Sequence, residues 1–335
     1  MNGRFTATVK YAVRKYIVPG IADKSIIVDR GFIFTMSGKA TGTEWVEKAK
    51  GNSAGTRFFI WIISKIGILP AYFVLLFAAA QYTLFDKKTR RVLKEFRRRS
   101  KLPCSVIHIY RHFYNFGMCL IDRYAFLLTQ KQFFRFTTHN EDLIERELHA
   151  GKGVILLGAH FGNWELAGNL LQGRLNAKVN FLMYDAESRA VKDAITKATA
   201  NRQVKIIFVG KDSTGTSIEL INALHRGEIV CLHGDRVLGE QRSVKVQFMG
   251  HDVSFPAGPF ILAAVSGAPV VPIFAVKTGL LTYAFSAHAP VRLGNISRQE
   301  RQGFIDSSVS AYARQLETLV KKYPLQWFNY YHFWG

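Results

Sequence analysis

The chain has 335 residues, 48% of them apolar, so it can bury a large core and is not an intrinsically disordered protein. Its 45 lysines and arginines exceed its 24 acidic residues, for a formal charge of +21. This excess predicts an anionic partner, which nucleic acid, an anionic membrane or an acidic protein would satisfy. The three cysteines show no CxxC spacing, which argues against a disulfide framework or a cysteine zinc cluster and favours a reducing, cytosolic setting.

The N-terminal stretch has no clear structural pattern. The first 35 residues lack the unbroken apolar core and the small-residue cleavage site of a secretory signal, so we expect no cleaved signal peptide. Residues 1–42 are interpreted as an N-terminal extension, and an alternative start at Met36 stays open.

Residues 66–85 contain no charged residue and are about as long as a helix that crosses a hydrocarbon core of roughly 30 Å. Nine of the residues from Lys87 to Lys101 are basic, which is typical of a segment at the cytoplasmic membrane surface. Residues 43–103 are therefore predicted to form a membrane-associated apolar helix and a basic helix. Three readings stay open for the apolar helix, namely that it crosses the membrane, lies in its surface, or is a soluble core helix.

From residue 104 to residue 335 short apolar runs alternate with amphipathic stretches, which predicts an α/β domain with a mostly parallel or mixed sheet flanked by helices. Helices are expected at residues 108–128, at 141–150 with a stop at Gly151, and within 165–175 and 216–227. The expected strands are residues 153–159, 179–184, 204–209, 228–234 and 268–276.

His160 follows directly on the first of these strands, and the residues after Asn163 read as a helix, so the histidine lies on a strand-to-helix loop. Ligand sites of open α/β sheets lie at the carboxyl ends of strands. Gly162 allows the loop to turn, so that Glu165 can accept a hydrogen bond from one imidazole nitrogen and leave the other facing the cleft. An imidazole with the usual pKa of about 6.5 and a carboxylate partner is suited to act as a general base.

Motifs of competing chemistries are absent from the sequence. It has no GxSxG elbow, no GxxxxGK[ST] and no GxGxxG, and His160 has neither a histidine at i+4 nor a nearby cysteine. We therefore expect no metal site. A base without a protein nucleophile would activate a hydroxyl or amine of a bound acceptor for attack on an activated acyl group.

The block HFGNWE (His160–Glu165) resembles the H-x4-D/E block of the lysophospholipid acyltransferase superfamily, and more closely that of its bacterial lipid A late acyltransferase branch. Residues 225–236, 255–274 and 323–334 resemble further blocks of that branch in order and type, and the resemblance covers about residues 43–335. It implies a glycerolipid acyltransferase-like fold at the cytoplasmic face of a bacterial inner membrane.

The resemblance assigns His160 as catalytic base and Glu165 as its carboxylate partner. It places Asp235 and Arg236, with Asn163 and more loosely Arg202, at the substrate. The implied donor is an acyl thioester of acyl carrier protein or coenzyme A, as co-substrate and with no further cofactor. The acidic carrier protein is preferred because this chain is basic, and anionic membrane lipids are expected partners for the same reason.

The opening of the resembling region, residues 44–67, departs from the lipid A enzymes and is closer to acyltransferases found among genes for other lipids and pigments. An aminolipid or a pigment-type lipid is therefore an alternative acceptor. A non-catalytic membrane-surface lipid-binding protein is a rival interpretation. Such a protein would be expected to lack the histidine or the glutamate, and this chain has both His160 and Glu165. A nucleic-acid binder is disfavoured, since Phe96 is the one aromatic residue of the basic segment.

Overall fold

A computed structural model describes residues 53–129, 133–163, 166, 175, 177–184, 204–209, 213–237, 241–293, 297 and 299–334. The predicted N-terminal extension, Glu165, Arg202 and most of the helix expected within residues 165–175 lie outside these described residues.

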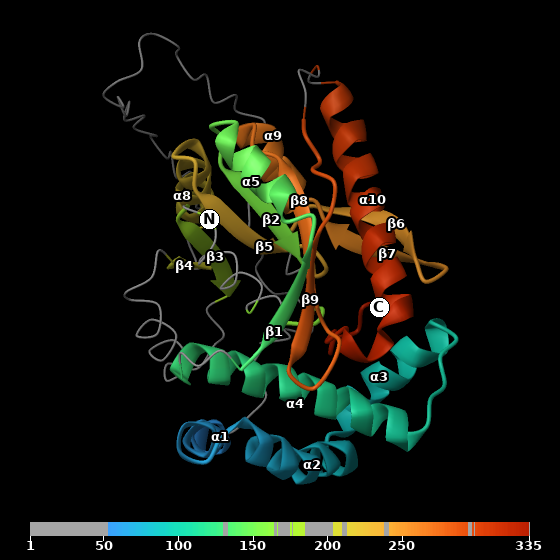
Figure 1. Cartoon of the computed structure of the whole chain (residues 1–335). Helices are drawn as coiled ribbons and strands as arrows, with labels where there is room; N and C mark the ends of the chain where they lie inside the picture. Colours follow the sequence, from blue (N-terminus) through green and yellow to red (C-terminus); the bar gives the residue numbers. More distant parts are fainter. Residues whose placement is uncertain are drawn as a thin grey trace, which may run out of the picture. The chain divides into compact units, whose positions relative to one another are not determined.

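Within the described residues, one seven-stranded sheet has the order β1-β9-β8-β2-β5-β3-β4 (Figure 1). Its strands are β1 (Arg135–His139), β2 (Val154–Gly158), β3 (Val179–Tyr184), β4 (Val204–Val209), β5 (Ile229–His233), β8 (Val270–Lys277) and β9 (Thr282–Ala287). Neighbouring strands run parallel except for β8 and β9, which are antiparallel. The fold class is thus the α/β class with a mixed sheet that the sequence predicts, and all five predicted strands are confirmed.

The middle of the sheet is buried on both faces. Every residue of β2 is buried, and its apolar side chains pack with those of β5 and β8 in one core cluster. This is the pattern expected of a central strand with layers on both sides. Helices α5 (Asp142–His149), α8 (Ser213–His225), α9 (Gly258–Ser266) and α10 (Glu300–Lys322) flank the sheet, together with the antiparallel pair β6 (Ser243–Phe248) and β7 (His251–Pro256).

Four helices precede the sheet in the chain, and Figure 1 shows them along one end of its strands. They are α1 (Ser53–Lys65), α2 (Ile68–Phe85), α3 (Lys87–Arg99) and α4 (Val106–Thr129). The predicted apolar and basic helices are therefore confirmed as α2 and α3, and they are separated by Asp86, whose side chain accepts the Thr89 N–H and so caps α3.

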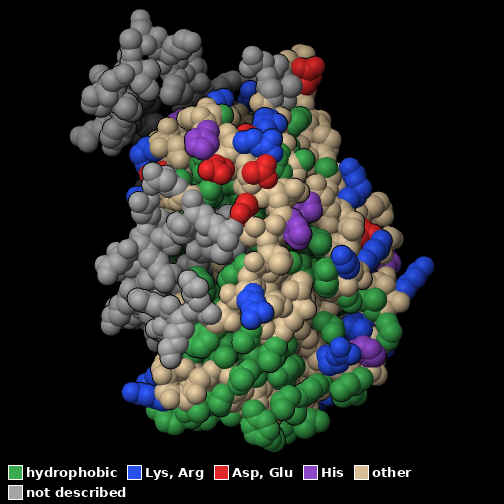
Figure 2. All heavy atoms as spheres, in the orientation of Figure 1, with side chains coloured by type: hydrophobic (Ala, Val, Ile, Leu, Met, Phe, Trp, Pro, Cys, Tyr) green, Lys and Arg blue, Asp and Glu red, His purple; other side chains and the backbone are tan. Residues whose placement is uncertain are grey.

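Helix α2 is long and apolar enough to cross a membrane by length and composition, and 33% of it is buried. Its buried side chains, which include Tyr72 and Leu75, pack against α4 in a shared apolar cluster. The opposite side of α2 is exposed, and in Figure 2 apolar side chains gather over this end of the molecule. One side of the helix therefore has a protein partner and the other has none among the described residues.

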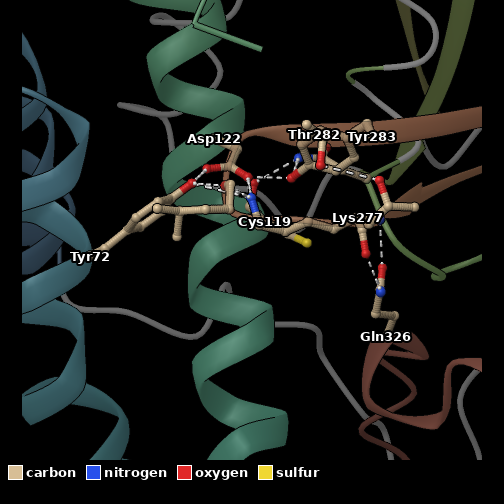
Figure 3. Close-up of polar contacts among 10 residues, drawn as sticks. Tyr72, Cys119, Asp122, Lys277, Thr282, Tyr283 and Gln326 are labelled. Carbon is tan, nitrogen blue, oxygen red and sulfur yellow. Dashed lines mark hydrogen bonds and ion pairs between the residues drawn. The ribbon is translucent and has the colours of Figure 1, made fainter. Parts of the chain in front are cut away.

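A buried polar cluster joins these helices to the sheet (Figure 3). The Lys277 ammonium at the end of β8 lies 2.5 Å from the Asp122 carboxylate of α4, and both side chains are almost fully buried. The hydroxyls of Tyr72 on α2 and Tyr283 on β9 also donate to Asp122. Because a buried charge needs partners of this kind, the cluster ties α2 and α4 to the neighbouring strands β8 and β9 in one arrangement.

Candidate active site

The register of two parallel strands brings His160 and Asp235 together. Gly158, the last residue of β2, is paired with His233, the last residue of β5. Each strand continues two residues further, to His160 on one side and to Asp235 on the other. Since neighbouring strands lie about 4.8 Å apart, the two side chains reach each other at the carboxyl edge of the sheet.

Asp235 bonds His160 twice. Nδ1 of His160 lies 2.8 Å from Oδ1 of Asp235, and the backbone N–H of His160 donates to Oδ2 at 3.0 Å. A carboxylate only accepts hydrogen bonds, so Nδ1 carries a proton, and in the neutral form of the ring the lone pair is on Nε2. Asp235 is fully buried, whereas 26% of the His160 side chain is exposed, so the pair has a protected anion and an accessible base.

Asp235 remains ionised in this setting. Burial alone would raise the pKa of its carboxyl, but the charge and hydrogen bond of His160 and the charge of Arg236 hold that pKa well below its ordinary value. The carboxylate can therefore stabilise an imidazolium whenever His160 takes up a proton.

His233 lies beside His160, with ring centroids 4.2 Å apart. Burial, together with the neighbouring charges of His160 and Arg236, holds the pKa of His233 well below its ordinary value. The second imidazole is therefore neutral at neutral pH and contributes a ring face rather than a charge. No pattern in the sequence indicates this contact.

Gly162 shapes the loop of residues 159–163, here called the His160 loop. Its φ of 62° lies in the left-handed region, and a Cβ there would come within 1.9 Å of the Ala275 carbonyl oxygen. This confirms the prediction that a glycine is needed for the turn. The next residue, Asn163, donates its backbone N–H to the same carbonyl at 2.9 Å, which fastens the loop to β8.

Two residues predicted to contact substrate have protein partners. The Asn163 amide donates to the Cys119 carbonyl at 3.0 Å and lies 3.4 Å from the Tyr283 hydroxyl, so it fixes the loop against α4 and β9. The Arg236 guanidinium donates to the Phe328 carbonyl at 2.8 Å and lies over the Tyr331 ring. Substrate contact by either residue stays a prediction, as do the roles assigned to Glu165 and Arg202, which lie outside the described residues.

The C-terminal residues complete the site, which the sequence reading did not anticipate. A short 3-10 turn, η1 (Pro324–Gln326), follows α10 and leads to Trp327. The Trp327 indole N–H donates to Oδ2 of Asp235 at 3.1 Å. Asp235 thus accepts hydrogen bonds from His160 on one side and from Trp327 on the other.

Comparison with known proteins adds to this geometry. A family model described as bacterial lipid A biosynthesis acyltransferase matches residues 109–334. A phosphatidylinositol mannoside acyltransferase of Mycobacterium tuberculosis (strain CDC 1551 / Oshkosh) is 25% identical over 131 residues, which span 39% of this chain and 41% of that protein. The solved structure of the 1-acyl-sn-glycerophosphate acyltransferase of Thermotoga maritima aligns with a TM-score of 0.36 and 14% identity, over 78% of this chain and 96% of that one.

Proposed function

We propose, since the chain belongs to the bacterial lipid A biosynthesis acyltransferase family and is a lipid acyltransferase, that it moves a fatty acyl chain from a thioester to a lipid hydroxyl. In this reaction His160 is the general base that takes the proton of the hydroxyl. The observation that carries this proposal is the state of the imidazole. Nδ1 is bound by a buried, ionised carboxylate, and Nε2 belongs to a partly exposed ring.

The reaction follows from this arrangement. Nε2 takes the proton of the acceptor hydroxyl as its oxygen attacks the thioester carbonyl, and Asp235 stabilises the imidazolium that forms. The tetrahedral intermediate collapses with cleavage of the carbon–sulfur bond, and the proton on Nε2 passes to the departing thiolate. The products are an ester and a free thiol, so protons and electrons balance without a further cofactor.

Asp235 takes in this mechanism the orienting role that the sequence reading gives to Glu165. Both of its oxygens are occupied by protein donors and it is fully buried, which leaves it no surface for an acceptor.

We place the enzyme on the cytoplasmic face of a bacterial inner membrane, with α1 and α2 lying in the surface rather than crossing it. The exposed apolar side chains of these helices and of the turn between them, here called the apolar face, are Phe58, Trp61, Ile66, Leu69, Phe73, Leu76, Phe77, Leu84 and Phe85. A spanning α2 would expose the Tyr72 side to lipid, but Tyr72 is bonded to the buried Asp122. In-plane burial covers the apolar face and leaves that cluster intact.

Charge supports an anionic environment. Lys87, Arg91, Lys94 and Arg98 are exposed along one side of α3, directly after the apolar face in the chain. In Figure 2, Lys and Arg side chains lie at the left and right borders of the apolar area. The same excess charge supports acyl carrier protein as donor in preference to coenzyme A.

The acceptor can be identified by comparing lipids of a deletion strain complemented with the wild-type gene or with His160→Ala. Mass spectrometry should show one lipid class that lacks an acyl chain in the deletion strain and regains it only with the wild-type gene. Lipid A-type, mannoside, aminolipid and pigment-type lipids form the panel. Equal recovery with His160→Ala would contradict the role of His160, and no change in any lipid would contradict acyl transfer.

A further inference from the structure

The block YPLQWFNYYHFW (residues 323–334) is one of the blocks that resemble the family, and none of its side chains takes part in the proton transfers proposed for His160. Residues 324–328 are here called the C-terminal clamp. Gln326 accepts the Gly162 N–H at 2.8 Å with its carbonyl, and the Phe328 N–H donates to the His160 carbonyl at 2.7 Å. An antiparallel bridge between Phe161 and Trp327 lies between these two bonds. The clamp therefore pairs with the His160 loop as a short extra strand would.

The clamp is itself fastened at its middle residue, Gln326. The side-chain amide of Gln326 accepts the Lys277 N–H at 2.9 Å and donates to the Lys277 carbonyl at 2.8 Å. Figure 3 shows that this lysine is the one whose ammonium is paired with Asp122. Because both ends of the amide are used and the site is buried, Gln326 fixes the clamp to the end of β8.

Beyond Gln326, the side chain of Trp327 turns to Asp235. Trp327 is almost fully buried, and its ring packs between Phe96, Phe248 and Phe333. His112 of α4 donates from Nε2 to the Trp327 carbonyl at 3.1 Å. Backbone, ring and indole N–H of this residue are thus each held by a different part of the chain, which aims the N–H at Oδ2 of Asp235.

We propose that Trp327 is a positioning residue of the reaction, whose indole N–H holds the Asp235 carboxylate in the plane that presents Oδ1 to Nδ1 of His160. Apart from Trp327, the donors to Asp235 that the structure gives both come from His160 itself. Without the indole N–H, no hydrogen-bond donor that the described residues place outside the His160 loop fixes the carboxylate about its Cβ–Cγ bond. This inference rests on the proposed function of His160 as base.

Loss of the N–H has a defined consequence. A carboxylate free to turn away from Nδ1 stabilises the imidazolium less, so protonation of His160 requires a lower pH. The groups that face His160 in the described residues are Asp235, the neutral His233 and, nearby, Arg236. Neither His233 nor Arg236 replaces the indole N–H as a constraint on the Asp235 carboxylate, because His233 carries no charge and Arg236 is bonded to the Phe328 carbonyl.

The experiment compares two isosteres of Trp327 in the full-length protein. 3-Benzothienylalanine has the shape of tryptophan with sulfur in place of the N–H, and 5-fluorotryptophan retains the N–H. With an acyl carrier protein thioester and the identified lipid, the first should lower kcat about tenfold with KM unchanged, and the second should not.

A second measurement is independent of activity. The rate at which diethyl pyrocarbonate modifies His160, followed by peptide mass spectrometry, gives the pH at which that histidine loses its proton. The midpoint should fall by about half a pH unit with 3-benzothienylalanine and stay at the wild-type value with 5-fluorotryptophan. A midpoint that stays or rises when the N–H is lost overturns the positioning role.

Controls separate this role from folding and from the proposed function. Trp334 packs beside Trp327, and its indole N–H has no hydrogen-bond partner among the described residues. If the protein with 3-benzothienylalanine fails to fold, Trp327→Phe replaces it, and Trp334→Phe is the matched control. A lowered melting temperature with an unmoved midpoint assigns Trp327 a packing role only and overturns the inference. If the wild-type protein transfers no acyl chain but the midpoint falls as expected, the proposed function fails and the positioning role stands.

Discussion

Asp235→Asn is the substitution whose effect the structure defines most sharply. The amide has one oxygen where the carboxylate has two, and three N–H groups point at the site: the backbone N–H and Nδ1–H of His160, and the indole N–H of Trp327. If the amide oxygen occupies the Oδ2 position it satisfies two of them, whereas at the Oδ1 position it satisfies one. The first orientation is therefore favoured.

In that orientation the amide NH2 faces Nδ1 of His160 and requires a lone pair there, so the proton moves to Nε2. The imidazole is then held in the tautomer that cannot accept a proton from the acceptor. An Asp-to-Asn change that imposes the wrong tautomer on a catalytic histidine lowers kcat by about 10⁴ in serine proteases. We expect a loss of about 10³ to 10⁴ here, with KM changed little.

The assay follows thiol release and lipid ester formation by the purified variant in detergent–lipid micelles. Asp142→Asn is the matched control, because Asp142 is an exposed residue of α5 paired only with Arg146 in the described residues and should leave kcat unchanged. Equal melting temperatures for the two variants would exclude unfolding as the cause. An Asp235→Asn enzyme within tenfold of wild type would refute the tautomer argument.

Three further predictions concern the membrane, the buried ion pair and pH. Phe73→Ser with Phe77→Ser should weaken binding to phosphatidylglycerol vesicles by at least about 100-fold, since each exposed ring contributes about 1.5 to 3 kcal/mol on burial and the two together about 3 to 6 kcal/mol, while Ile218→Ser on α8 should not; equal binding in a flotation assay would contradict in-plane docking. Lys277→Met should cost about 3 to 5 kcal/mol of unfolding free energy in denaturant titrations, and adding Asp122→Leu should restore part of it; a double variant no more stable than the single would show that the two charges are not coupled. Burial, and then the charge of Arg97, lower the pKa of His112 to about 3, so between pH 6.5 and 3 only the unfolded chain binds this proton, and stability is lost as the pH is lowered through that window; His112→Gln should remove about 2 kcal/mol of the loss of unfolding free energy between pH 7 and pH 5.

The sheet could be predicted from the sequence where its strands are continuous apolar runs. Residues 154–158 and 270–277 are buried throughout and were expected as strands. The edge strand β1 was not, because its residues alternate between exposed and half-buried and the run RFTTH contains two charged or titratable ends. β9 alternates between half-buried and buried residues, and its pairing with β1 joins residues far apart in the sequence.

The site shows the same division. His160 was identified because the strand, the loop and Gly162 are consecutive in sequence. Its bond to Asp235 depends on β2 and β5 being neighbours in register, and strand order is not encoded in any local pattern. A usable signal was present, since both residues stand two positions after the end of a buried strand. The contact of Trp327 with Asp235 joins residues 92 positions apart and had no such local signal.

The central claim, that His160 transfers a proton during acyl transfer to a lipid, is tested most directly by His160→Gln in a purified assay. Wild-type protein with an acyl carrier protein thioester and membrane lipid should release thiol and form lipid ester in equal amounts. His160→Gln should bind the same vesicles, melt at the same temperature and form ester at the uncatalysed rate. Ester formation by His160→Gln at the wild-type rate would contradict the mechanism.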